Sequence, residues 1–266
     1  MKRTRGLWLA PDVEAELAQG WRRSFWRWFE DDRLRLPGLD SGRLALVDSP
    51  LGRLVAKRDG RRGWLVWSGL RAAHGLRAFR VGRALQQHGI PCAEPLAYVQ
   101  RRGLPPLVDG ALISRYVSAP HLWDFLEEKA SCEPRLEPML AALAEGLAQL
   151  HGAGFRHRDL KASNLLAQQH GPAALRIVFI DLDGARGPKR IPLRLRQRDL
   201  ARLAASFLTP RALGLGIESG HWSQLLAAYL EHAKLDPELL PVWEANTARW
   251  AAEHNARNEA RGRSLS

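Results

Sequence analysis

Four residues in the middle of the chain have the types and the spacing for acid–base and metal chemistry. Asp159, Lys161 and Asn164 lie within six residues of one another, and Asp181 follows seventeen residues after Asn164. A carboxylate can accept the proton of an attacking hydroxyl, and a lysine can neutralise charge that develops on a transferring group. Carboxylate and amide oxygens are the ligands that Mg²⁺ prefers. We therefore predict Asp159 and Lys161 as catalytic residues, and Asn164 and Asp181 as magnesium ligands.

These residues belong to a longer pattern. The segment His157-Arg-Asp-Leu-Lys-Ala-Ser-Asn164 matches the kinase catalytic-loop signature H-R-D-L-x-x-x-N at every fixed position. The apolar run Ile177-Val-Phe179 then leads to Asp181, as expected of a strand that delivers a metal-binding Asp into a turn. Asp183 is either a second metal ligand or a cap. Phosphoryl transfer needs positioning and charge neutralisation more than covalent chemistry, and these residue types supply both. The pattern therefore predicts a kinase.

A second pair of residues is predicted to hold the nucleotide. Lys57 ends the predicted strand Leu54-Val-Ala-Lys57, which is close to the V-A-I-K pattern whose lysine binds the ATP phosphates. Gly52 lies in the turn before that strand, without a G-x-G-x-x-G pattern. A solvent-facing strand lysine is the alternative for Lys57.

One feature of the kinase pattern is missing. Kinases orient the strand lysine with a glutamate on the following helix, but residues 72–88 contain no acid, and Ala78 stands about where one is expected. Glu94 or an acid of the N-terminal segment remains as the partner of Lys57, unless the lysine is held differently. A pseudokinase is the corresponding alternative, although Asp159, Asn164 and Asp181 are all present.

The elements that must position these residues follow from hydrophobic periodicity. The predicted fold class is α+β: a two-lobed, protein-kinase-like fold with a β-rich N-lobe and an α-rich C-lobe. The expected domains are a helical extension over 1–41, an N-lobe over 42–117, a C-lobe over 118–256 and a frayed tail over 257–266. Strands are expected at 43–47, 53–57, 96–100 and 111–117 and as a pair within 155–184, and the helices after residue 120 at 121–130, 136–153, 197–208, 220–232 and 236–256.

The charge of the chain favours an anionic partner. Forty basic and 28 acidic residues give a net charge of +12, and 34 of the basic residues are arginines. Six basic residues and no acid lie between Gly184 and Arg198, just after the predicted metal ligand, and no A-P-E motif follows. This segment is short for docking a polypeptide, whereas guanidinium groups bind carboxylates and phosphates. We expect it to bind the acceptor, with a solvated loop as the alternative; the predicted acceptor-binding residues are Arg186, Lys189, Arg190 and Arg194.

The chain's location is expected to be cytoplasmic. No apolar window is long enough for a transmembrane helix, the run Gly6–Ala10 is too short for a signal peptide, and two cysteines give no disulfide framework. Trp21, Phe25, Trp28 and Phe29 lie at helical spacing with arginines between them. Such a stripe is typical of core packing, and contact with an anionic membrane surface is the alternative.

The catalytic loop and its surroundings resemble the lipopolysaccharide kinase family, bacterial kinases of Kdo or heptose in the lipopolysaccharide inner core. The resemblance extends over about residues 42–232 and includes Asp181-Leu-Asp183, the run Arg198–Ser206 and Gly89-Ile-Pro-Cys-Ala-Glu-Pro95-Leu-Ala97. It implies ATP and Mg²⁺ as cofactors, a sugar hydroxyl as acceptor and work at the inner leaflet of the cytoplasmic membrane. By position, it carries the catalytic Asp to Asp159, the metal ligands to Asn164 and Asp181, and the nucleotide lysine to Lys57.

Other functions remain open at this point. An atypical, minimal protein kinase is one alternative, although the missing A-P-E motif and the basic segment count against it. A small-molecule phosphotransferase for cationic acceptors would need an acidic pocket, and the basic segment has the opposite sign. A basic nucleic-acid-binding protein is compatible with the pI of about 10.7, but charge alone supplies only non-specific affinity, so nucleic acid is an unlikely partner.

Overall fold

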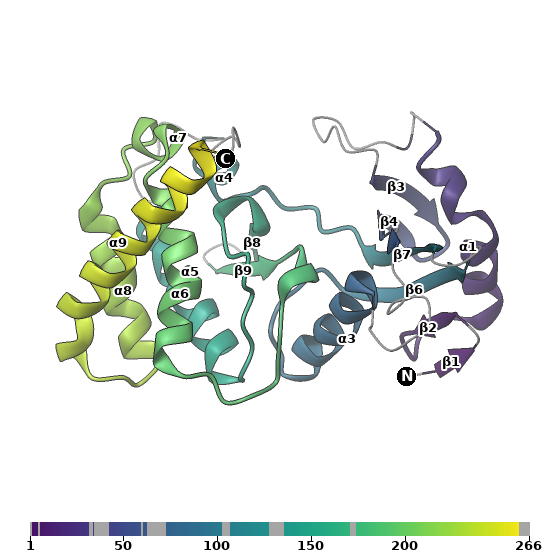
Figure 1. The fold of residues 1–266 in the computed structure, drawn as a ribbon, viewed down its shortest axis with the longest axis horizontal. Coiled ribbons are helices and arrows are strands. Elements are labelled where there is room, and N and C mark those ends of the chain that lie inside the picture. The colour runs from purple at the N-terminus through teal and green to yellow at the C-terminus, as the bar shows by residue number, and fades with distance from the viewer. Residues whose placement is uncertain are drawn as a thin grey trace. The chain divides into compact units, whose positions relative to one another are not determined.

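The computed structural model describes residues 2–4, 6–31, 34, 43–59, 61–62, 73–102, 107–127, 136–170 and 174–260. The chain divides into two compact units. Unit 1 comprises Met1–Gln87 and Ala93–Val117, and unit 2 comprises His88–Cys92 and Ser118–Ser266. The antiparallel sheet lies in unit 1 and most of the helices lie in unit 2 (Figure 1). The predicted α+β class is therefore confirmed.

Unit 1 is built on a seven-stranded sheet whose described pairs are all antiparallel. The strand order is β1-β2-β6-β7-β4-β3, and β5 pairs with β7. Leu54 and Ala56 are fully buried on one face of β4. Because side chains alternate along a strand, Lys57 projects from the other face. The strands are β1 Lys2–Thr4, β2 Leu7–Leu9, β3 Leu44–Ser49, β4 Gly52–Arg58, β5 Arg61–Arg62, β6 Pro95–Arg102 and β7 Leu107–Arg115.

Two helices cover opposite faces of this sheet (Figure 1). Helix α1, Ala15–Trp28, packs Trp21 and Phe25 into the core formed with β4, β6 and β7. Helix α3, His74–Gln87, packs Phe79 against Tyr98 on the other face. The N-terminal aromatic stripe is thus core packing for Trp21, Phe25 and Phe29, which are at most 5% exposed.

The beginning of the chain differs from the helical extension predicted over residues 1–41. Residues Lys2–Thr4 and Leu7–Leu9 are strands that extend the sheet beside β6. Leu7 and Leu9 face the core under α1, while Trp8 faces the core under α3. A strand buried on both faces has no apolar–polar alternation, so periodicity does not distinguish it from a helix.

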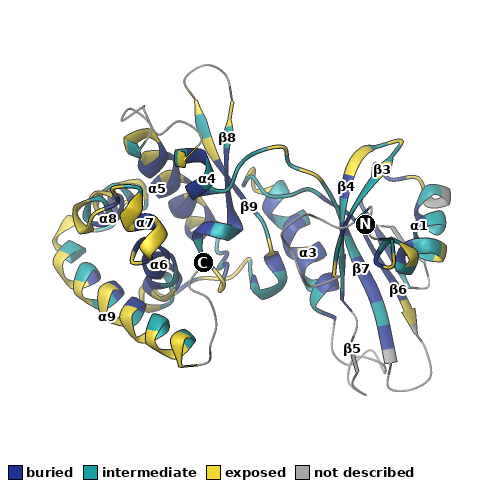
Figure 2. Ribbon diagram, turned by 90° about the horizontal axis from the view of Figure 1, so that it is seen from above, coloured by how far each residue is buried: buried dark blue, intermediate teal, exposed yellow. Residues whose placement is uncertain are grey.

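Unit 2 is mainly helical and carries one antiparallel hairpin. Helix α5 is buried along most of its length. Helix α9 packs against α6 and α8, with Trp243, Thr247 and Ala251 buried and its other positions more exposed (Figure 2). The helices are α4 Leu122–Glu127, α5 Leu136–Gly152, α6 Leu193–Phe207, α7 Pro210–Gly214, α8 Ser219–His232 and α9 Leu240–Glu259; the hairpin strands are β8 Leu165–Gln169 and β9 Leu175–Phe179; the one-turn helices are η3 Ala162–Asn164, η4 Leu182–Gly184 and η5 Pro237–Leu239.

The C-terminal end of the described chain is more ordered than predicted. Helix α9 continues to Glu259, so part of the segment predicted as a frayed tail is helical. Residues 261–266, like Cys132, lie outside the described residues. Among the described helices, none combines the length and the hydropathy that crossing a bilayer requires.

The start of α3 depends on a carboxylate from the strand side of unit 1. Asp59 follows β4, is 6% exposed and accepts a hydrogen bond from the Gly75 backbone N–H at 2.6 Å. Replacing Asp59 by Ala leaves that buried N–H without its acceptor, so we expect a loss of about 1–2 kcal/mol in the free energy of unfolding. Chemical denaturation measures the change.

The matched control is Asp48→Ala on the neighbouring strand. Asp48 is 84% exposed and pairs with an Arg53 that is 58% exposed, so its removal should change stability by less than about 0.5 kcal/mol. Equal effects of the two substitutions would contradict the capping role of Asp59.

Candidate active site

The hairpin of unit 2 brings two of the predicted ligands together. Asn164 ends the turn before β8, and Asp181 follows β9 by two residues. The antiparallel register pairs Leu165 with Phe179, and the Ile180 N–H donates to the Asn164 carbonyl at 3.0 Å. The two residues lie 17 positions apart in sequence, and the hairpin places them at the same end of one strand pair.

The side chain of Asn164 joins this end of the hairpin to the predicted catalytic aspartate. Its Nδ2 donates to the Asp159 carbonyl at 2.8 Å and to Asp159 Oδ2 at 3.2 Å. Asn164 is 5% exposed, whereas Asp159 and Asp181 are exposed. Because the amide nitrogen of Asn164 is used on Asp159, its oxygen is the atom that it can offer to a cation. The donor set of one amide oxygen and one exposed carboxylate fits Mg²⁺.

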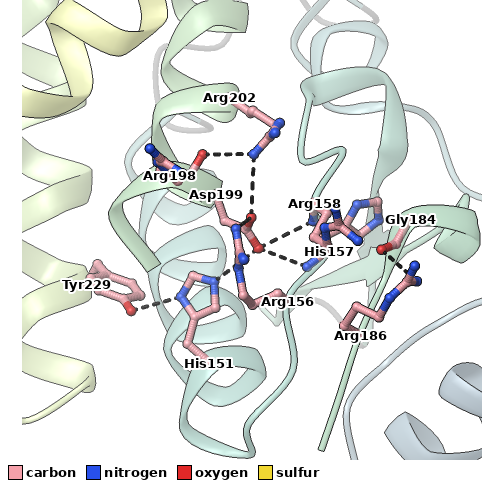
Figure 3. Close-up of polar contacts among 10 residues, drawn as sticks. All are labelled: His151, Arg156, His157, Arg158, Gly184, Arg186, Arg198, Asp199, Arg202 and Tyr229. Carbon is pink, nitrogen blue, oxygen red and sulfur yellow. Dashed lines mark hydrogen bonds and ion pairs between the residues drawn. The ribbon is translucent and has the colours of Figure 1, made fainter. Parts of the chain in front are cut away.

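The catalytic loop, residues 157–164, is held in place by the carboxylate of Asp199 on α6. Asp199 is fully buried, and its Oδ2 accepts from the backbone N–H groups of His157 at 2.9 Å and Arg158 at 3.3 Å. Its Oδ1 accepts from the Arg156 guanidinium at 3.0 Å, and Arg202 lies 3.8 Å away (Figure 3). One carboxylate therefore fixes the backbone of His157 and Arg158, immediately before Asp159, and the side chain of Arg156.

The charges around Asp199 keep it ionised. Burial alone would raise the pKa of its carboxyl, but His151, Arg156 and the Arg158 N–H outweigh this effect and hold the pKa below its usual range. His151 Nε2 lies 3.7 Å from Asp199 Oδ2, and its Nδ1 lies 2.8 Å from the Tyr229 hydroxyl (Figure 3). Burial lowers the pKa of His151, which Asp199 only partly offsets. The imidazole is therefore neutral near pH 7.

Other contacts fix the two ends of the loop. His157 is 1% exposed, and its Nε2 donates to the Ile180 carbonyl at 2.8 Å, so this histidine holds the loop in place. The Ala162 N–H donates to Ser206 Oγ on α6 at 3.1 Å. Arg158 and Asp181 have φ values of 65° and 55°, in the left-handed region that L-residues rarely adopt. Asp183 lies inside η4, whose N-cap residue is Asp181, so Asp183 is not the cap of this helix.

The predicted nucleotide residues both lie in unit 1. Gly52 and Lys57 belong to the same strand, β4, and Lys57 pairs with Leu112 of β7 on the sheet face that α3 covers. Ala78 of α3 is buried at 1% exposure. Glu94, a candidate partner of Lys57, forms ion pairs with two arginines. It accepts a hydrogen bond from Arg115 Nε at 2.8 Å and lies 4.0 Å from Arg83.

The predicted acceptor segment divides into two parts. Arg186 uses its Nη1 on the Gly184 and Ala185 carbonyls, and its backbone pairs with Arg156. Lys189, Arg190 and Arg194 are exposed. The first residue thus helps to shape the loop, and the other three present their charges to solvent.

Sequence reasoning did not assign a role to Asp199, although a signal was present. Asp199 is the only acid between Gly184 and Ile217, within a segment rich in arginine. A solitary acid among bases is expected to be paired. The contact with the catalytic loop 40 residues earlier, however, is set by tertiary packing.

The neutral buried histidine makes stability depend on pH. In the unfolded chain His151 binds a proton near its usual pKa of 6.5, whereas the folded chain resists protonation. Between pH 7 and pH 5 the unfolded state therefore binds more protons, and stability falls as the pH falls. We expect His151→Gln to weaken this pH dependence in urea unfolding curves.

His232→Gln is the matched control, because His232 is exposed on α8. This variant should keep the wild-type slope of stability against pH. A wild-type slope in His151→Gln would show that the buried imidazole does not resist protonation.

Comparisons with known proteins agree with this geometry. The model of the lipopolysaccharide kinase (Kdo/WaaP) family matches residues 61–229, which is more than half of the chain. A solved structure described as "WaaP in complex with acyl carrier protein" aligns with a TM-score of 0.62 at 20% identity, covering 94% of this chain and 98% of that one. At this identity the likeness shows the fold alone.

Two curated protein kinases match a shorter stretch. The serine/threonine-protein kinase AfsK of Streptomyces coelicolor is 42% identical over 65 residues, and AfsK of Streptomyces griseus is 41% identical over 68 residues. Each match covers 24% of this chain and only 8% of the relative. The family match over residues 61–229 shows that the chain belongs to the lipopolysaccharide kinase (Kdo/WaaP) family, and the fold agrees with it.

Proposed function

We propose that the protein transfers the γ-phosphoryl group of ATP to a sugar hydroxyl, of Kdo or heptose, in the lipopolysaccharide inner core. The observation that carries the proposal is the arrangement at the hairpin end. There the Asn164 side chain donates hydrogen bonds to Asp159, and the Asn164 carbonyl accepts one from Ile180, the residue before Asp181. Family membership supports a kinase, and the arrangement supplies a proton acceptor next to a pair of cation ligands.

Each residue has a defined task in this reaction. Asp159 accepts the proton of the attacking sugar hydroxyl through its exposed carboxylate. Asn164 donates a hydrogen bond to that carboxylate, so the Asp159 side chain is already in place before the acceptor binds. Lys161 neutralises charge on the transferring phosphoryl group. Lys57 and Gly52 bind the phosphates of the nucleotide.

A magnesium ion would be held by Asn164 and Asp181. When bound, it would neutralise the phosphate charges and orient the nucleotide. The backbone just before Asp181 is fixed, since Ile180 is bonded to Asn164 through its N–H and to His157 through its carbonyl.

The acceptor is proposed to be anionic. Lys189, Arg190 and Arg194 are exposed within 13 residues of Asp181, and guanidinium groups bind carboxylates and phosphates bidentately. An acceptor within a membrane glycolipid implies a cytoplasmic protein that works peripherally at the inner membrane. The name of the similar structure adds a second partner to test, since that protein was found with an acyl carrier protein.

The experiment that tests the proposal follows phosphoryl transfer from γ-labelled ATP and Mg²⁺. Dephosphorylated inner-core lipopolysaccharide, bulk protein and water are offered in parallel as acceptors. We expect label in the glycolipid. Label in protein would favour a minimal protein kinase, in line with the short AfsK matches. Mg-ATP binding without transfer to any acceptor would favour a pseudokinase.

The substitution Asp159→Asn tests the proton acceptor. Asparagine keeps the shape of the side chain and its place beside Asn164 but accepts no proton, so we expect the turnover number to fall by about 10²–10⁴-fold. The dissociation constant for Mg-ATP should change little. The label assay and equilibrium nucleotide binding measure the two effects.

Glu231→Gln removes one exposed carboxylate from α8 and serves as the matched control. This variant should keep wild-type turnover. Wild-type turnover in Asp159→Asn would exclude Asp159 as the proton acceptor.

A further inference from the structure

A row of buried side chains in unit 2 leads from helix α8 to the catalytic loop. The Tyr229 hydroxyl of α8 lies 2.8 Å from Nδ1 of His151, at the end of α5, and Nε2 of His151 lies 3.7 Å from Asp199 Oδ2 on α6 (Figure 3). The same carboxylate oxygen accepts from the His157 N–H of the loop at 2.9 Å. Tyr229 thus lies at the end of the row that is farthest from the loop.

Packing fixes the place of the hydroxyl in this row. Tyr229 and His151 are both buried, and their rings meet edge to face with centroids 5.7 Å apart. The Tyr229 ring also lies 5.8 Å from the ring of Trp243, a buried residue of α9. The hydroxyl is therefore held beside the imidazole by residues of three helices, in a place that is removed from solvent.

The Tyr229 hydroxyl has a proton to donate. Burial raises its pKa to about 12, against the lowering effect of Arg196, so the hydroxyl is protonated at neutral pH. Arg196 carries hydrogen-bond donors only, so it does not accept this proton in a hydrogen bond. His151 Nδ1, in contrast, is an acceptor whenever it carries no proton of its own.

The other side of the imidazole faces a negative charge. The neutral His151 ring carries one proton, on either Nδ1 or Nε2, and the ionised Asp199 carboxylate is an acceptor only. A proton on Nε2 presents an N–H to this carboxylate. A proton on Nδ1 would instead turn the lone pair of Nε2 toward it, between two fully buried side chains where repulsion is little screened. The distance of 3.7 Å is too long for a hydrogen bond, so the N–H acts on Asp199 as a dipole.

We propose that Tyr229 is a positioning residue of the catalytic loop: its hydroxyl donates to Nδ1 of His151 and so keeps the imidazole proton on Nε2, directed at the carboxylate of Asp199. Without the hydroxyl, α8 no longer opposes a proton on Nδ1, and the tautomer that repels Asp199 becomes accessible. The inference rests on the proposed function for its effect on turnover. The place of the proton and the order of the loop are properties of the folded protein alone.

The place of the proton is measured by ¹⁵N NMR on protein labelled in its nine histidines. The resonances of His151 are those that disappear in His151→Gln. Protonated and unprotonated ring nitrogens differ in chemical shift, so the spectrum shows which nitrogen carries the proton. We expect the proton on Nε2 in the wild type at pH 7. A proton on Nδ1 would overturn the inference, and this result does not require any Tyr229 variant to fold.

The effect on the loop is measured by amide hydrogen exchange in Tyr229→Phe, which keeps the ring and removes the hydroxyl. We expect exchange at His157 and Arg158 to become about threefold to tenfold faster, the size of effect expected for the loss of one supporting hydrogen bond. Tyr98→Phe is the matched control, since Tyr98 is as fully buried but lies in unit 1. The control should keep the wild-type exchange of the loop. Wild-type exchange in Tyr229→Phe as well would overturn the inference.

A double substitution distinguishes the role of the proton from simple packing. The side-chain amide in His151→Gln has an N–H donor that does not depend on a tautomer. In this background Tyr229→Phe should therefore cause no further acceleration of exchange at His157 and Arg158. The same acceleration in both backgrounds would show that the tyrosine acts through packing alone, and would overturn the inference.

Turnover separates this inference from the proposed function. If the wild type transfers phosphate, Tyr229→Phe should lower the turnover number by about threefold to tenfold. The KM for ATP should stay close to wild type, because the loop positions Asp159 for the chemical step. Wild-type turnover in this variant would overturn the positioning role. If the wild type transfers no phosphate, the proposed function fails, while the NMR and exchange experiments still decide the role of Tyr229.

Discussion

The geometry of the candidate site depends on one buried carboxylate. Asp199 is removed from solvent, an arrangement that is unfavourable for a charge unless hydrogen bonds and cations compensate. Backbone N–H groups of His157 and Arg158 and the guanidinium of Arg156 supply that compensation. The same bonds prevent the loop before Asp159 from moving independently of α6. The stability of the buried charge and the position of the predicted catalytic residue therefore have one cause.

The remaining parts of unit 2 act on the loop from its other sides. The hairpin holds Asn164 and the backbone before Asp181 at one end, and His157 ties the loop to the same strand through Ile180. Helix α6 holds the loop again at Ala162, next to its contact with α9. A kinase needs such fixed groups, because phosphoryl transfer is accelerated mainly by positioning and by electrostatic stabilisation. The His151 imidazole, 3.7 Å from Asp199, is neutral because burial lowers its pKa, so it adds no further buried charge.

Local patterns were sufficient for the elements and the loop, and tertiary contacts decided the rest. The catalytic-loop signature and the apolar run that leads to Asp181 predicted the kinase-like fold and the strand pair from short stretches of sequence. Strand β2 was mistaken for helix because it is buried on both faces. The role of Asp199 depends on the packing of α6 against a loop far away in sequence, which no local pattern encodes. Asp59 accepts a hydrogen bond from Gly75 near the start of α3, a contact that the sequence did not predict.

The measurement that tests this account most directly is made on Asp199→Asn. Asparagine fills the same volume but lacks the charge that binds Arg156 and one of the two acceptor atoms. The account predicts faster amide hydrogen exchange at His157 and Arg158, together with a turnover number at least about 100-fold lower, since misplacing a catalytic group by about 1 Å has an effect of that size. Circular dichroism would verify that the variant is folded. Wild-type exchange and wild-type turnover in the folded variant would contradict the claim that this carboxylate positions the catalytic loop.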